Sequence, residues 1–228
     1  YLAEGGKHFR FFINPSSTDI EFEEVGYYQD RQHLAWEVDK IIELCEENGA
    51  LIDFNLMYHT LMMRMGDYHQ FKYDYTDNWH DSSAWPYKDI NHISGYSKML
   101  DSKRPSDMFM EEEAFKYLRQ KTRYMMARWG YSTAISFIEL VSEPWHIDQN
   151  GFTHYTPYDS LTPEGDRARK AVYKYHKDIA SYIKDSLKIN NKIIAAVGRL
   201  PVGSTKLYSH LTTELPNQID STWHDPNI

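Results

Sequence analysis

The 228-residue sequence predicts an α/β fold in which helices cover a parallel β-sheet. Short apolar segments rich in β-branched and aromatic residues alternate along the chain with segments whose apolar residues recur at helical spacing. The strand segments are mostly apolar throughout, which is typical of strands buried on both faces. A regular β-α-β-α succession of such segments indicates parallel strands joined by helices. The composition, 41% hydrophobic and 25% charged residues, is that of an ordinary globular domain.

The expected elements follow one another in order. We expect strands at residues 8–14, 50–59, 134–143, 192–198 and 218–224, and helices at 32–49, near 106–129 and from 162 to about 187. Gly49 is the residue type that commonly follows a helix end, and Thr162 with Pro163 is typical of a helix start. Trp36 and Trp129 lie on expected helices and are interpreted as core residues.

The longest segment without a regular period runs from 60 to 107. It contains Trp79, Trp85 and several tyrosines, and it is too aromatic for a disordered linker. It follows the carboxyl end of an expected strand, where parallel α/β folds place their sites. We interpret it as one wall of a cleft within a single domain that spans residues 1–228.

Composition argues against several classes of partner. The net charge of −8 argues against a nucleic-acid partner, because neutralising phosphates requires clustered Lys and Arg. No run of about 18 apolar residues is present, so no membrane span is predicted. The single cysteine, Cys45, excludes an internal disulfide and a cysteine-based metal site. The 18 tyrosines suit surfaces that are both apolar and hydrogen-bonding, such as sugar-binding clefts, although most are expected to pack at the rim of the core.

Neither a cofactor nor a metal site is predicted. The histidines lack the helical two-His spacing of zinc proteases. Asp74, Asp77 and Asp81 offer carboxylates in the long loop, but their spacing differs from that of a calcium-binding loop. Solvation at the surface is the favoured interpretation for these three residues.

Polar side chains stand near the carboxyl ends of the expected strands. They are Arg10 and Asn14, Tyr58 and His59, Ser142 and Glu143, Arg199, and Trp223, His224 and Asp225. In a (β/α)8 barrel these strand ends converge on one mouth, and catalytic groups come from several strands. We therefore expect these residues to line one site.

The segment RYMMARWGYSTAISFIELVSEPW, residues 123–145, resembles the fourth-strand region of clan A glycoside hydrolases. Cellulase- and mannanase-like members read Arg-Tyr, then Arg-Trp-Gly, then a strand that ends in Asn-Glu-Pro. HFRFFIN, LIDFNLMYH and IDSTWHD are similar to their second, third and sixth strands. The resemblance implies a (β/α)8 TIM barrel of which this chain covers roughly strands two to six. It also implies an enzyme that cleaves a β-linked, mannan- or glucan-like polysaccharide with retention of configuration.

Carried over by this resemblance, Glu143 is the general acid/base, whose pKa an apolar surround must raise toward the working pH. The competing interpretation is that Glu143 pairs with a local arginine, which would be Arg10, Arg123 or Arg128. The implied substrate-binding residues are Arg10, His59, Ser142, Trp145, Trp223 and His224. For the arginine and the histidines, a purely structural role is the competing interpretation.

Two departures from the family pattern matter. Ser142 stands where the family has Asn, and its shorter hydroxyl is expected to reach a sugar only through water. The nucleophile of this family lies on a seventh strand, so we expect that carboxylate beyond the 228 residues, in a longer protein. The other option is a partner chain that completes the barrel.

The implied protein is bacterial, lies outside the cytoplasm in a secreted, periplasmic or cell-surface location, and binds an oligo- or polysaccharide. The alternative function is a non-catalytic, glycan-binding or structural barrel subunit of a cell-surface assembly, with other chains as partners. Ser142 favours this alternative, because a site that has lost activity tolerates such a change.

Overall fold

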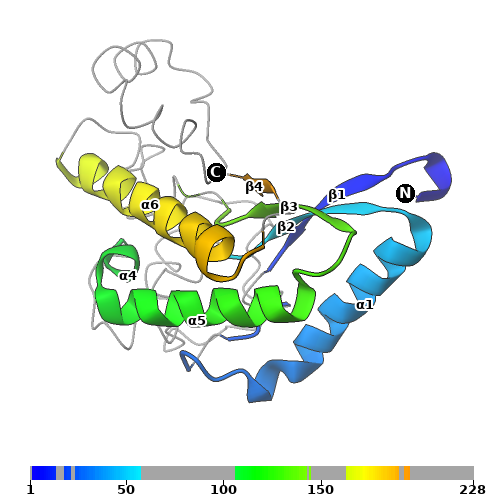
Figure 1. The fold of residues 1–228 in the computed structure, drawn as a ribbon, viewed down its shortest axis with the longest axis horizontal. Helices are drawn as coiled ribbons and strands as arrows, with labels where there is room; N and C mark the ends of the chain where they lie inside the picture. The colour runs from blue at the N-terminus through cyan, green and yellow to red at the C-terminus, as the bar shows by residue number, and fades with distance from the viewer. Residues whose placement is uncertain are drawn as a thin grey trace, which may run out of the picture.

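The computed structural model describes residues 2–13, 18–21, 24–57, 106–142, 144, 163–189 and 193–195. Within these ranges the chain forms a β-sheet with helices packed against it (Figure 1). The strands are β1 (His8–Phe12), β2 (Leu51–Asn55), β3 (Ile135–Glu139) and β4 (Ile193–Ala195). The main helices are α1 (Gln32–Asn48), α4 (Asp107–Met110), α5 (Glu112–Trp129) and α6 (Pro163–Ser181). Short 3-10 turns precede β1 (η1, Leu2–Glu4) and α1 (η2, Gln29–Arg31), and a π-helical turn (η6, Tyr182–Ser186) ends α6.

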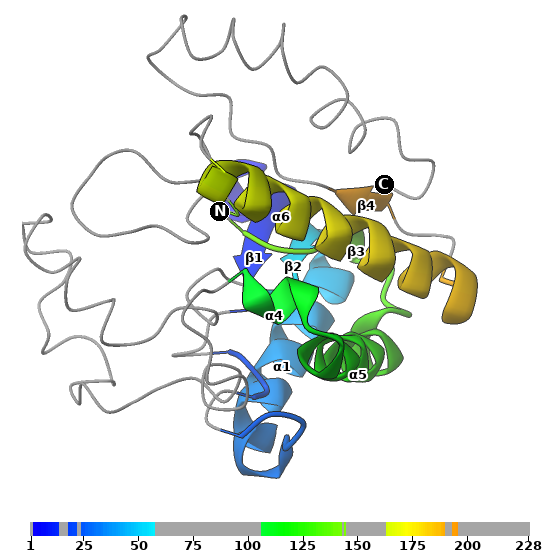
Figure 2. The same cartoon turned by 90° about the vertical axis from the view of Figure 1, so that its left-hand side faces the viewer.

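The four strands are parallel and pair in the order β1-β2-β3-β4. Each strand therefore lies beside the one that precedes it in the sequence, and the connection between them carries a helix. Right-handed crossovers, the almost universal hand, place all such helices on the same face of the sheet. Residues of α1, α5, α6 and the sheet accordingly share one hydrophobic core, and Figures 1 and 2 show these helices gathered along the sheet.

The prediction of a parallel sheet covered by helices is confirmed, but the prediction of a (β/α)8 barrel is wrong. The described residues form an open four-stranded sheet, in which β1 pairs only with β2 and β4 pairs only with β3. A closed barrel requires each strand to pair on both sides, with the tilt and stagger that closure imposes. The expected fifth strand, at 218–224, lies outside the described residues.

Helix α1 confirms the predicted helix at 32–49. Leu34, Val38, Ile42 and Cys45 are buried along one side of the helix. Gly49 ends it in a left-handed conformation, with φ of 63°, and its N–H donates to the carbonyl of Glu46. Glycine adopts this conformation without the steric cost that other residues meet.

The interpretation of Trp36 as a core residue is wrong, because its side chain is 57% exposed. Trp36 lies two residues from both Leu34 and Val38, which turns it away from the buried side of α1. The ammonium group of Lys40 lies 5.9 Å from its ring centroid, so the ring packs against a charged side chain at the surface.

The single helix predicted near 106–129 is two helices. Glu111 adopts an extended conformation, with ψ of 126°, and separates α4 from α5. The predicted apolar stripe of α5 is confirmed, because all its members are buried: Phe115, Leu118, Thr122, Met125, Met126 and Trp129. Trp129 contacts Phe54 of β2 edge to face, with 5.6 Å between ring centroids, which joins α5 to the sheet.

Helix α6 begins at Pro163, as predicted, and buries Ala168, Val172 and Ile179. Tyr175 fixes the helix over the sheet, because its hydroxyl donates to the carbonyl of Leu140 at 3.1 Å. Its ring stacks on Phe109 of α4, with 4.4 Å between centroids. Burial raises the pKa of Tyr175 well above its ordinary value, so the phenol stays protonated and continues to donate.

Candidate functional site

The two faces of the sheet differ in chemistry. Ile52, Phe54 and Ile138 point into the core shared with the helices and are fully buried. Side chains alternate between the faces along each strand, so the other face carries Arg10 of β1, Asp53 and Asn55 of β2, and Glu139 of β3. We call these four residues and Ser142 the sheet-face cluster. No helix of the described part packs on this face.

Arg10 and Glu139 form the centre of the sheet-face cluster. The Nε of Arg10 donates to Oε2 of Glu139 at 2.5 Å, and Nη2 donates to Oε1. Because β2 lies between β1 and β3, the arginine side chain crosses β2 to reach its partner. The carboxylate of Glu139 is fully buried, whereas the side chain of Arg10 is 35% exposed. The fork geometry therefore fixes β1 and β3 relative to each other.

Burial raises the pKa of Glu139, and the Arg10 guanidinium offsets part of that increase. The guanidinium is the compensating positive charge that a buried carboxylate needs to remain ionised. The pair thus neutralises a charge inside the fold.

Asp53 is the second carboxyl group beside Arg10, with its Oδ2 at 4.0 Å from the arginine Nε. Its Oδ1 is buried and accepts no hydrogen bond within the described structure. Burial raises the pKa of Asp53, while the positive charges of Arg10 and His8 oppose that increase. One guanidinium thus faces two carboxyl groups and binds only Glu139 closely.

Ser142 is fixed by groups from both neighbouring strand segments. Its N–H donates to the carbonyl of Met57, just beyond β2, at 2.8 Å. Its hydroxyl accepts from Nη2 of Arg10 at 3.2 Å. The buried Asn55 side chain lies beside Ser142, with its amide oxygen turned toward that residue. This oxygen then accepts from the Ser142 N–H at 3.0 Å, and the Asn55 amide nitrogen donates to the Met57 carbonyl at 2.9 Å. Ser142 is fully buried, as are Leu140 and Val141 before it.

The structure brings two of the predicted site residues, Arg10 and Ser142, into direct contact. Glu143, the predicted acid/base, lies outside the described residues, between the fixed Ser142 and the buried Pro144. The other predicted site residues outside the described part are Asn14, Tyr58, His59, Trp145, Arg199, Trp223, His224 and Asp225. For Arg10, the structure agrees with the interpretation of an arginine paired with a nearby acid. Its contact with a sugar, and that of Ser142, stays a prediction.

Sequence reasoning missed Glu139, Asp53 and Asn55. Each is a polar residue inside an otherwise apolar strand, in ISFIE and LIDFN. The spacing of these positions already indicated a shared face, because Asp53 and Asn55 are two residues apart in one strand. Combined with Arg10 in HFRFF, they indicate a sheet with one charged face. The two arginines other than Arg10 considered as partners of Glu143 are Arg123, which is exposed, and Arg128, which pairs with Asp39 of α1.

Within the described ranges, no three His, Cys, Asp or Glu side chains gather closely enough to hold a metal ion. The helices of these ranges are also too short or too polar to cross a membrane. Asp74, Asp77 and Asp81 lie outside them. No protein-family model matches the chain, and a search of curated proteins found no match.

Proposed function

We propose that this chain is part of a retaining glycoside hydrolase that acts on a β-linked, mannan- or glucan-like polysaccharide, with Glu143 as general acid/base. One observation carries the proposal: Ser142, the residue directly before Glu143, is buried and held by Arg10 and Met57. In open α/β sheets, ligands bind outside the carboxyl ends of the strands, and Ser142 follows the carboxyl end of β3.

A general acid/base has to be held within hydrogen-bond reach of the glycosidic oxygen while it gives up and regains a proton. The backbone at Ser142, directly before position 143, is held in place because its N–H donates to the carbonyl of Met57 in the segment after β2. Leu140, Val141 and Pro144, which are close to position 143 in the sequence, are apolar and buried. Apolar surroundings raise a carboxyl pKa toward neutrality, as an acid catalyst requires.

The Arg10–Glu139 pair supports the same chemistry electrostatically. An arginine near an acid catalyst lowers the pKa of that acid and keeps it ionised. Because Glu139 accepts from two nitrogens of the Arg10 guanidinium, its negative charge neutralises much of the positive charge of Arg10 locally. We infer that Glu139 is a positioning residue: it holds Arg10 against Ser142 and moderates its field at position 143.

A retaining mechanism also needs a nucleophile about 5 Å from the acid/base. Glu139 is fully buried and paired, so it does not meet a substrate. Within the described part the cluster has one further carboxyl group, Asp53, whose Oδ2 faces Arg10. We therefore place the nucleophile outside the described residues. His59, Trp145, Trp223 and His224 are the proposed sugar contacts, with the tryptophans stacking on pyranose faces. A polymeric substrate is consistent with a secreted, periplasmic or surface-attached bacterial enzyme.

The test is Glu143→Gln in the full-length protein, assayed on soluble β-mannan and β-glucan by release of reducing ends. Loss of acid/base catalysis should lower turnover by roughly 10²- to 10⁴-fold. Glu47→Gln, a change at an exposed carboxylate near the end of α1, is the matched control and should leave turnover unchanged. If Glu143→Gln retained wild-type turnover on a substrate the protein cleaves, the assignment would be wrong.

One observation favours the second candidate function, a non-catalytic glycan-binding or structural subunit of a surface assembly. The Ser142 hydroxyl accepts from Arg10 in the interior, so it is already engaged where the family's asparagine would face a sugar. This candidate predicts glycan binding without release of reducing ends by the wild-type protein. The same assay, combined with a binding measurement, separates the two functions.

A further inference from the structure

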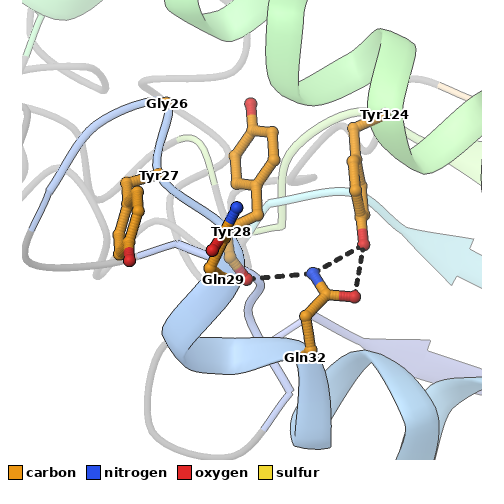
Figure 3. A pocket seen from close by; sticks show the side chains of 6 residues that line it. All are labelled: Gly26, Tyr27, Tyr28, Gln29, Gln32 and Tyr124. Carbon is orange, nitrogen blue, oxygen red and sulfur yellow. Dashed lines mark hydrogen bonds between the residues drawn. The ribbon is translucent and has the colours of Figure 1, made fainter.

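A pocket of about 530 Å³ lies away from the sheet-face cluster, where the start of α1 meets α5. Its lining consists of Gly26, Tyr27, Tyr28, Gln29, Gln32 and Tyr124. Figure 3 shows the rings of Tyr27 and Tyr124 on two sides of it, with Gln32 reaching toward Tyr124. We propose that this pocket binds one pyranose unit of a neutral glycan, as a second site separate from the proposed catalytic centre. The choice of a β-glycan as its ligand rests on the proposed function.

The lining determines the class of ligand. Three tyrosine rings offer apolar faces that suit the C–H groups of a sugar ring, and the Gln29 amide and the Tyr27 hydroxyl offer donors and acceptors for its hydroxyls. None of the six lining residues carries a charge at neutral pH. A charged ligand would find no counterion on these walls, whereas a neutral, polyhydroxylated ring matches both kinds of surface.

One wall of the pocket is held by hydrogen bonds among its own side chains. Nε2 of Gln32 donates to the Tyr28 carbonyl and to the Tyr124 hydroxyl, each at 2.9 Å. Nη1 of Arg128 donates to Oε1 of Gln32 at 2.9 Å and to the Tyr124 hydroxyl at 2.8 Å. Two other guanidinium nitrogens of Arg128 bind Asp39 at 2.9 and 2.6 Å. The amide and the arginine are thus used internally, and this wall offers a ligand mainly its ring surface.

The other wall has unused polar groups. Within the described structure, the Tyr27 hydroxyl and the Gln29 amide make no hydrogen bond, and both residues are exposed. The Tyr28 hydroxyl is buried and also has no partner there. Burial and the nearby carboxylates of Glu21 and Asp19 raise the pKa of Tyr28 well above its ordinary value, so the phenol remains a neutral donor. We assign ligand hydrogen bonds to Tyr27 and Gln29, since these two reach solvent.

Buried charges anchor the chain that forms this pocket. Asp19 is fully buried and pairs with Nζ of Lys121 on α5 at 2.6 Å. Glu21 accepts from the N–H of Gly26 at 2.8 Å. Gly26 has φ of +78°, and a Cβ there would lie 3.0 Å from the Tyr117 ring, so any other residue at this position would be strained. The loop is held to α5 before any ligand arrives, which lowers the conformational cost of binding.

The experiment follows the side-chain amide signals of Gln29 and Gln32 by NMR in Glu143→Gln protein, during titration with cellotetraose and with mannotetraose. Using the Gln variant prevents hydrolysis, and the local signals distinguish this pocket from any binding at the sheet. The Gln29 signal should shift and saturate with one of the two sugars. Tyr27→Ala should weaken that binding about tenfold, the change expected from removing one stacking ring. Tyr131→Ala, which truncates a 70% exposed tyrosine beyond α5, is the matched control and should leave the affinity unchanged.

Two results would overturn the pocket assignment: a Gln29 signal that does not move with either sugar, or an affinity unaltered by Tyr27→Ala. Tyr27 and Tyr131 are both exposed, so replacing either with Ala should not impair folding. Thermal unfolding of each variant checks this. Failure here is distinct from failure of the proposed hydrolase, which the turnover of wild-type protein decides without reference to Gln29. If Glu143→Gln lost turnover but the Gln29 signal did not move, the proposed hydrolase function would stand and the proposed second glycan site would be wrong.

Discussion

The two faces of the sheet use the same strands for opposite purposes. The face toward the helices is apolar, with Phe54 packed against Trp129 of α5. The other face carries Arg10, Asp53 and Glu139, charged groups that cost free energy to bury. The first face accounts for stability through area removed from water. The second contributes little net stability, and its geometry instead fixes the chain at Ser142. Residues inside strands can therefore serve the site rather than the core.

The largest expected effect is on the apolar face. Phe54→Ala removes a fully buried ring and leaves a cavity beside Trp129, and should lower the free energy of unfolding by about 4 kcal/mol. Urea denaturation followed by tryptophan fluorescence measures this change. A loss below about 1 kcal/mol would contradict the view that this face carries the stability.

The next largest effect is on the charged face. Arg10→Met leaves the Glu139 carboxylate buried without its partner, and should cost about 3 kcal/mol at pH 7. The substitution should also raise the pKa of Glu139 further. The cost should therefore shrink as the pH falls through that raised pKa, because the protonated carboxyl no longer needs a counterion.

Urea denaturation of Arg10→Met and of wild type at a series of pH values from neutral to acidic tests this. The double variant Arg10→Met, Glu139→Met is the control, since removing both charges should recover much of the loss. A cost that is independent of pH would show that packing, and not charge, explains the effect.

A smaller effect, of opposite sign, is expected at Asp53. Burial raises the pKa of Asp53, so the protonated carboxyl stabilises the folded state relative to the unfolded state at a pH below the ordinary pKa. This stabilisation is lost as the pH rises through the raised pKa, because the carboxyl must then ionise in a partly buried position. Asp53→Asn removes the buried charge and should stabilise the protein by roughly 1 kcal/mol at pH 7, with no gain at low pH. Thermal unfolding at neutral and acidic pH measures the difference, and destabilisation at pH 7 would contradict it.

The smallest effect is expected outside both faces. Trp36 is 57% exposed on α1, so Trp36→Ala should change the free energy of unfolding by no more than about 0.5 kcal/mol. Trp129→Ala, the same change at the fully buried tryptophan, is the contrast and should cost about 4 kcal/mol. Equal effects at the two positions would contradict the burial of α5 against the sheet.

Local patterns predicted the individual elements well. The stripe that ends at Trp129, the glycine at position 49 and the proline at position 163 each act within one or two helical turns, so a window of sequence contains their physics. Trp36 was misplaced although its position opposite Leu34 and Val38 already indicated exposure. The break at Glu111 depends on how α4 and α5 pack, which no local pattern expresses.

Global features could be predicted only in part. Alternating elements predicted parallel pairing, but closure into a barrel depends on strand number and stagger, which the succession of strands does not determine. Ser142 was found because strand ends in parallel sheets carry function. Glu139 was missed because its partner, Arg10, lies 129 positions away along the chain. Only the strand register shows that the two share a face.

The most direct test compares two glutamates of one segment, Glu139 and Glu143, each changed to Gln. We predict that Glu143→Gln loses turnover of β-mannan or β-glucan by roughly 10²- to 10⁴-fold while unfolding as wild type does. Glu139→Gln should lower the free energy of unfolding and should reduce turnover per folded molecule far less than Glu143→Gln does. The opposite assignment, in which turnover survives at position 143 and is abolished at position 139, would contradict it.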